Sequence, residues 1–240
     1  MAASAFAVES ANTVGYLSDS SVSGYNWVAL DFATIGQNSG TLGGIALGDT
    51  AVGYTDNIQI LGNRGNTLEL YYWATEDDEV EVDGLTGYYV GWVNRSDEPV
   101  CDNVLARGNA VLVSTKNANT AIKRCGEVQT NAVTITSVSG YNFVGNPFPV
   151  DGTLGDIALG NTAIGYTDNI QVLGNRGNTL ELYYWATEDD EVEVDGLTGY
   201  YVGWVNRSDE PVCDNALAAG AGVLVSTKNA GTTITISPNL

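Results

Sequence analysis

Two acidic segments hold the side chains in this sequence whose types and spacing could do chemistry. The first contains Glu76, Asp77 and Asp78, and the second contains the copies Glu188, Asp189 and Asp190. Calcium is bound by several oxygens, often carboxylates together with backbone carbonyls, so both triplets are candidate calcium ligands. The alternative, which we favour, is a solvated hairpin, because the acids that follow alternate with Val80 and Val82 as in a half-buried strand.

Aromatic residues lie next to both acidic segments. The candidates for binding a ligand are Tyr71, Trp73, Tyr183 and Trp185. Strand alternation places Tyr71 and Trp73 on one face, where exposed rings could stack against a sugar. A glycan is therefore a candidate ligand. The alternative that we favour is packing of these rings against a neighbouring strand, loop or domain.

Catalytic chemistry has little support in the sequence. The chain has no His, which removes Ser-His-Asp and Cys-His catalysis and His-containing zinc sites. Paired carboxylates could hydrolyse glycosides, but acids are so common here that any pair could be chosen. We therefore assign no catalytic residue and expect a protein that is not an enzyme.

The charge of the chain limits its partners. The 29 acidic and 9 basic residues give a net charge of −20, which repels nucleic acids and anionic membranes. No segment is apolar for long enough to span a bilayer. We expect neither nucleic-acid binding nor membrane insertion.

The elements that must position the acidic segments are strands. Gly is abundant, with 29 residues, and short runs rich in Thr, Val, Ile and Tyr alternate with turn residues, which is typical of an all-β protein. A long block that begins at Gly53 is repeated from Gly165, and its only change is Ile60 to Val172. The repeat is long enough for an independent β domain.

We therefore predict two tandem homologous β-sandwich (or barrel-like) domains of about seven or eight strands each, over residues 8–124 and 125–240. Residues 1–7 end in Ala5-Phe6-Ala7, which fits the small-x-small pattern of a signal-peptide cleavage site. We interpret residues 1–7 as a signal-peptide remnant and expect a secreted or cell-surface protein.

The three cysteines are distributed unequally between the repeats. Cys101 and Cys213 are equivalent, whereas Ser237 occupies the position equivalent to Cys125. A Cys101–Cys125 disulfide is therefore a candidate in the first repeat alone. Cys213 would then be a buried free thiol or would pair with another chain.

Several short motifs resemble those of uncharacterised secreted bacterial tandem-repeat β proteins. They are the Ala-ending signal segment, "NTVGY" at Asn12–Tyr16, "GYNFVGNPFP" at Gly140–Pro149, "DNIQV" at Asp168–Val172 and "AGAGVLV" at Ala219–Val225. The resemblance implies an extracellular location in a bacterium and a β architecture, and it carries no catalytic residues. The first repeat has "ALDF" where the second has "GNPF", so that motif is intact only once.

The junction between the repeats suggests a way for chains to associate. No Pro/Gly/Ser linker separates the repeats, so the second repeat of one chain could meet the N-terminal strand of the next chain as repeat 1 meets repeat 2. Such a head-to-tail contact does not close and gives a filament. We thus expect a structural protein that self-associates through its terminal strands, with a carbohydrate-binding or adhesive module as the alternative.

Overall fold

The computed structural model describes residues 14–34, 37, 39–61, 68–82, 85–128, 130–173, 180–194 and 197–238. Its described part is all-β, as predicted, and its helical content is two single turns of 3-10 helix. The predicted signal-peptide remnant at residues 1–7 lies outside the described residues. No helix in the described residues is long and apolar enough to cross a membrane.

The strands of the first repeat are more numerous and shorter than predicted. They are β1 (Val14–Ser20), β2 (Gly24–Ala29), β3 (Phe32–Ala33), β4 (Ser39–Thr41), β5 (Ile45–Leu47), β6 (Asn57–Leu61), β7 (Leu68–Ala74), β8 (Glu79–Val82), β9 (Leu85–Tyr88), β10 (Gly91–Val93), β11 (Val104–Ala106), β12 (Ala110–Thr115) and β13 (Ala121–Val128), with the 3-10 turn η1 (Leu42–Gly44) before β5. A five-stranded antiparallel sheet has the order β10-β7-β6-β12-β2, and a second sheet joins β1, β3 and β5 to β13.

The second repeat is built in the same way. Its strands are β14 (Val133–Thr136), β15 (Gly140–Gly145), β16 (Gly152–Thr153), β17 (Ile157–Leu159), β18 (Asn169–Leu173), β19 (Leu180–Ala186), β20 (Glu191–Val194), β21 (Leu197–Tyr200), β22 (Gly203–Val205), β23 (Ala216–Leu217), β24 (Gly222–Thr227) and β25 (Thr233–Ile236), with the turn η2 (Leu154–Asp156) before β17. The five-stranded order β15-β24-β18-β19-β22 matches that of the first repeat, and β14, β25 and β17 form the second sheet.

The boundary between the repeats differs from the prediction. We placed it between Arg124 and Cys125, but β13 continues through both residues to Val128. Its last part pairs with β1 and β3, so the strand belongs wholly to the first repeat. The equivalent strand β25 ends at Ile236, so among the described residues the part of β13 after Arg124 has no strand counterpart that the repeat pattern could have shown.

Each repeat has its own hydrophobic core. In the first, Ile58, Trp73 and Val113 from the five-stranded sheet pack with Ile45 and Ile122 from the second sheet. The corresponding residues of the second repeat form an equivalent cluster. The core of each repeat therefore lies between its own two larger sheets.

The strands β12 and β24 are apolar on both faces, and this explains their sequences. Val111 and Val113 of β12 belong to the core of the first repeat, whereas Ala110 and Leu112 pack on the opposite face with Leu224 of β24. A strand that is covered on both faces needs an uninterrupted apolar run rather than alternation. The outer faces of the two five-stranded sheets thus form the contact between repeats.

The contact between repeats is nearly two-fold symmetric. The Ala29 amide donates to the carbonyl of Gly220 at 2.8 Å, and the Gly145 amide donates to the carbonyl of Gly108 at 3.0 Å. The repeat alignment makes Ala29 equivalent to Gly145 and Gly108 equivalent to Gly220. Each bond is therefore the copy of the other, as in the isologous interface of a homodimer.

Residues on the symmetry axis pack against their own equivalents. Trp27 lies edge-on against its counterpart Phe143, with ring centroids 5.0 Å apart. A Cβ added to Gly222 would lie 2.8 Å from the Cβ of its counterpart Ala110, and a Cβ at Gly145 would overlap Ala29. Glycine at these two positions in the second repeat lets the two sheets approach closely.

The contact within the chain differs from the head-to-tail contact used above as the pattern for self-association, which itself stays a prediction. Repeat 1 meets repeat 2 through equivalent faces, and a contact of this kind closes on itself. The last strand is also engaged, because Ile236 of β25 lies beside Gly108 of the first repeat. The last strand accordingly ends beside the first repeat.

Candidate functional surfaces at the two ends of the molecule

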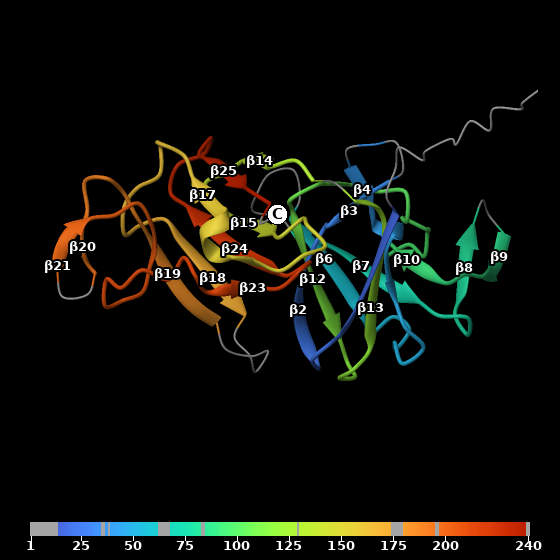
Figure 1. The fold of residues 1–240 in the computed structure, drawn as a ribbon. Coiled ribbons are helices and arrows are strands. Elements are labelled where there is room, and N and C mark those ends of the chain that lie inside the picture. Colours follow the sequence, from blue (N-terminus) through green and yellow to red (C-terminus); the bar gives the residue numbers. More distant parts are fainter. Residues whose placement is uncertain are drawn as a thin grey trace, which may run out of the picture.

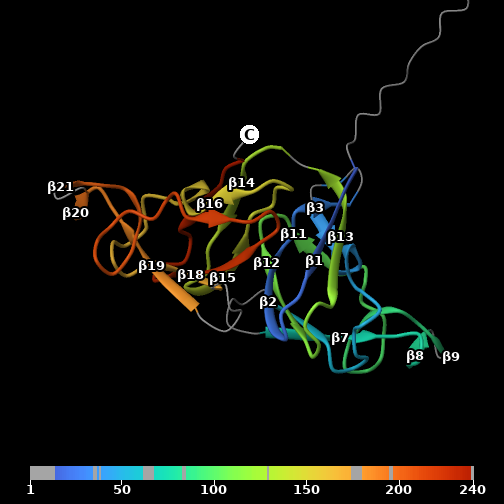
Figure 2. The ribbon, with the colours of Figure 1, turned by 60° about the horizontal axis from the view of Figure 1, so that its bottom comes forward.

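The two-fold contact places the near-identical parts of the repeats far from each other. The hairpins β8–β9 and β20–β21 lie at opposite ends of the molecule in the views of Figure 1 and Figure 2. The nearly identical blocks begin at Gly53 and Gly165 and include these hairpins. The molecule therefore presents almost the same surface at both ends.

The two tryptophans predicted as a sugar platform are buried. Trp73 and Trp185 are each 5% exposed. Trp73 packs edge-on against Trp92 with centroids 4.9 Å apart, and Trp185 packs in the same way against Trp204. The prediction of exposed tryptophan rings is wrong, because the face of β7 that carries Trp73 turns toward the core. The packing alternative is the one that the structure has.

The tyrosines of that predicted platform are half-buried. The Tyr71 hydroxyl donates to Glu69 Oε2 at 2.9 Å and accepts from Asn103 Nδ2 at 3.1 Å. Burial raises the pKa of Tyr71, and the hydrogen bond to the Glu69 carboxylate raises it further. Tyr183 makes the equivalent bonds to Glu181 and Asn215. These hydroxyls are occupied by their own repeat.

The acidic triplets form turns. Glu76 and Asp77 are exposed, whereas Asp78 accepts hydrogen bonds on Oδ2 from the amide and the hydroxyl of Thr75, both at 2.7 Å. Any Cβ at Gly53 would overlap this carboxylate. Asp190 closes the equivalent turn through Thr187, and Glu188 and Asp189 are exposed.

Among the residues that the structure describes, no group of three or more acids or cysteines is arranged to hold a metal ion. The predicted calcium ligands are therefore adjacent along the chain but do not converge.

The strand that follows the first triplet, β8, has the predicted orientation: Val80 points inward and is 1% exposed. The Val80 side chain packs on Ala74 and Val93, and Tyr72 and Tyr89 lie against this small cluster.

A hollow of about 490 Å³ lies beside the second acidic triplet. Trp185, Glu188 and Asp189 contribute to its wall, together with Asn161 and Val202. The structure thus brings a predicted aromatic residue and two predicted acids to one concave site. Two carboxylates and an amide are suited to polar hydroxyl or cation ligands.

Two further hollows flank the contact between the repeats and are related by its two-fold symmetry. The larger, of about 470 Å³, includes Val104, Ile135 and Asn142, and the smaller, of about 360 Å³, includes the equivalents Ala216, Asp19 and Asn26. Each hollow combines residues from both repeats. Sequence patterns gave no sign of them, because they exist only where the repeats meet.

Each end also contains backbone in the left-handed region at residues that are not glycine. Tyr54 has φ 53° and Asp97 has φ 61°, and their copies Tyr166 and Asp209 have φ 54° and 60°. Burial raises the pKa of Tyr54 to about 12, with a further contribution from its hydrogen bond to Asp97. Two hydrogen bonds hold the strained backbone of Tyr54 and Asp97 in place. One is the bond between their side chains, and in the other the Tyr54 amide donates to the Trp73 carbonyl.

The predicted Cys101–Cys125 disulfide is not formed in the structure. All three cysteines are free, with Cys125 exposed and the other two half-buried. The Cys101 sulfur lies 2.7 Å from the Tyr89 hydroxyl, and Cys213 makes the same contact with Tyr201. Cys101 thus contacts the tyrosine equivalent to the one that its copy contacts.

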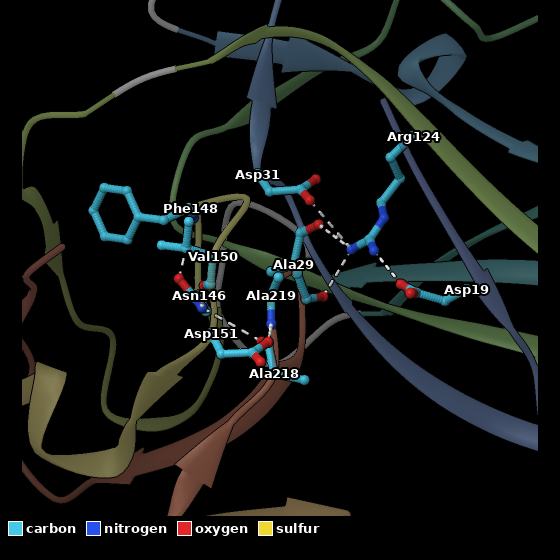
Figure 3. Close-up of polar contacts among 11 residues, drawn as sticks. Asp19, Ala29, Asp31, Arg124, Asn146, Phe148, Val150, Asp151, Ala218 and Ala219 are labelled. Carbon is cyan, nitrogen blue, oxygen red and sulfur yellow. Dashed lines mark hydrogen bonds and ion pairs between the residues drawn. The ribbon is translucent and has the colours of Figure 1, made fainter. Parts of the chain in front are cut away.

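Sequence reasoning missed an ionic cluster at the contact between the repeats. Arg124, 2% exposed, pairs with Asp19, lies 3.6 Å from Asp31 Oδ2 and donates to the Gly220 carbonyl at 2.8 Å. Figure 3 shows the guanidinium directed toward Asp19 and Asp31. Ile236 replaces Arg124 in the second repeat. The sequence contained one signal of this cluster: the first repeat has a charged residue, Arg124, where the second repeat has an apolar one.

The "GNPF" motif has a local structural role in the second repeat. Asn146 is buried, donates to the Val150 carbonyl at 2.8 Å and accepts from the Phe148 amide at 3.1 Å (Figure 3). Phe148 in turn lies under Arg107 of the first repeat, whose Cζ is 5.3 Å from the ring centroid. This cation–π contact links the motif to the interface.

The comparisons with known proteins add no relative: no family model, no curated protein and no solved structure matches this chain.

Proposed function

We propose that the protein is a secreted or cell-surface structural protein, in which two β-sandwich domains form one building block with like ends. The main support for this proposal is the two-fold contact between the repeats, which directs the near-identical blocks outward. A unit with the same surface at both ends can link two copies of whatever that surface binds. This is the property required of a subunit in an extracellular assembly.

The distribution of differences between the repeats supports this proposal. The block from Gly53 changes only at Ile60, whereas at the contact between the repeats Phe143 replaces Trp27 and Ile236 replaces Arg124. A pair of faces that meet each other can diverge together. Two faces that must bind the same partner have to stay alike.

Self-association is the direct test of the proposal. Electron microscopy and analytical ultracentrifugation of the purified chain, over a range of concentrations and salt, should show linear assemblies at high concentration. Salt should promote them, because it screens the repulsion that follows from a net charge of −20. A particle that stays monomeric in every condition contradicts the proposal.

An adhesive or carbohydrate-binding module is the second candidate, supported by the hollow beside Trp185. Its two acids and Asn161 could accept and donate hydrogen bonds to sugar hydroxyls, with or without a calcium ion. A glycan array probed with the full chain, with and without calcium, tests this function. Binding that the double variant Glu76→Gln with Glu188→Gln abolishes would favour it over a purely structural role.

A further inference from the structure

The hairpins at the two ends have unpaired backbone edges. β8 and β9 form a separate two-stranded sheet, and so do β20 and β21. Within the described residues, none of these strands pairs with any other strand. An unpaired strand edge presents free amide and carbonyl groups, which are a template for another strand.

The two strands of each hairpin differ in how their edges are protected. β8 contains Glu79 and Glu81, and charges of this kind discourage edge pairing. β9, with the sequence LTGY, contains neither a charged residue nor a proline. β21 has the same sequence at the other end.

The surface next to β9 is apolar and open. Tyr88 is 73% exposed and Val90 57%, and nothing lies within 4 Å of the position that a Cβ would take at Gly87. Tyr200 and Val202 have nearly the same exposure, 73% and 58%. Exposed tyrosine and valine side chains at a free edge are of the kind that a pairing strand could cover.

We propose that β9 and β21 are the strands through which copies of this chain associate end to end, each pairing with β9 or β21 of a second copy. This inference rests on the proposed structural function and names the surface that it uses. Two identical strands can pair antiparallel about a two-fold axis, because the contact is then the same for both partners.

The charges favour a second copy as the partner. The chain carries a net charge of −20, and Glu79 is exposed on the strand beside β9. Pairing β9 with its own copy sets an uncharged strand against an uncharged strand and keeps the two β8 strands, with their acids, on the outside. β8 paired with itself would instead oppose like charges, which is unfavourable.

The symmetry of the chain makes this contact propagate. A protein with one such strand would stop at a dimer. This chain has one at each end, so every addition leaves a free strand, and the product is a linear filament. Each contact involves only short strands, so assembly should be weak, reversible and dependent on concentration.

Charge placed on the edge tests the inference in the full chain. Lysine on an edge strand blocks pairing, and Tyr88 and Tyr200 are exposed enough for replacement to leave the fold intact. The single variant Tyr200→Lys should stop at dimers, and the double variant Tyr88→Lys with Tyr200→Lys should be monomeric. The measurements are sedimentation velocity and electron microscopy at the concentration where the wild-type chain forms filaments.

The matched control is the double variant Tyr25→Lys with Tyr141→Lys. These tyrosines are 52% and 53% exposed on β2 and β15, so the control has the same charge change at an equivalent pair of sites. It should form filaments like the wild type. Circular dichroism of all variants verifies that each is folded.

The outcomes separate this inference from the proposed function. Filaments that persist in the double variant at Tyr88 and Tyr200, or a single variant that grows beyond dimers, would overturn the role of β9 and β21 while leaving a structural function in place. A wild-type chain that never assembles would overturn both.

Discussion

The replacement Asp31→Asn should make the protein more stable at neutral pH, although it removes a charge beside a buried arginine. Asp31 is 1% exposed, and its Oδ2 has no hydrogen-bond partner among the described residues. Burial raises the pKa of its carboxyl from 3.8 to about 6 and outweighs the opposing attraction of Arg124. Asparagine is shaped like the neutral form that the site prefers.

The raised pKa gives the sign of the effect and its order of magnitude. The folded protein binds the proton of Asp31 more tightly than the unfolded chain, so its stabilising contribution is complete below about pH 3.8 and is lost as the pH rises through 6. The change in pKa corresponds to about 3 kcal/mol, because one pKa unit is about 1.4 kcal/mol. The variant should therefore gain up to about 3 kcal/mol over the wild type at pH 7.5 and almost nothing at pH 4.

Urea denaturation at a series of pH values from 4 to 8 measures this difference, because urea leaves the ionic strength unchanged. Comparison with the wild type at each pH cancels the titration of the many other acids. Asp49→Asn, at an exposed aspartate, is the control with the same charge change. A variant less stable than the wild type at pH 7.5 would refute the reasoning, since it would mean that pairing with Arg124 outweighs burial.

Three further substitutions test the packing. Trp92→Phe removes the buried bond from its indole nitrogen to the Ile45 carbonyl, at 2.6 Å, and should cost about 1–3 kcal/mol in urea denaturation. Asp78→Ala removes both bonds to Thr75 and should cost about 1–2 kcal/mol, measured in the same way. Gly145→Val should loosen the contact between the repeats, because its side chain would meet the backbone of the first repeat, and calorimetry should then resolve two transitions instead of one.

The sequence predicted the strand content and the duplication because both are local properties. The alternation of Val80 with acids set its orientation correctly, and Val80 is 1% exposed. The same alternation placed Tyr71 and Trp73 together but could not tell which face of the sheet meets the core. That choice depends on the second sheet, whose Ile45 carbonyl accepts the Trp92 bond.

The exposed edge hairpins and the cluster around Arg124 could not be predicted from either repeat alone. The exposure of Tyr88 follows from its place on a hairpin beyond the main sheets. The partners of Arg124 come from β1, from the chain after β2 and from the second repeat. Such contacts join residues far apart in the chain, and a periodic pattern contains no information about them. A comparison of the two copies position by position would have shown where they occur.

The contact between the repeats also gives a reason why the duplication stayed in one chain. In a symmetric dimer, a residue at the position of Arg124 would occur on both sides of the axis, and both guanidiniums would be buried. In the fused chain only one side carries the charge, and Ile236 fills the other with an apolar side chain. Fusion thus permits an asymmetric interface that a homodimer cannot have, while the outward surfaces remain alike. The pairing of the buried arginine with Asp19 and Asp31 lies within the first repeat, and its bond to the Gly220 carbonyl reaches the second repeat, which has Pro147 where Asp31 stands.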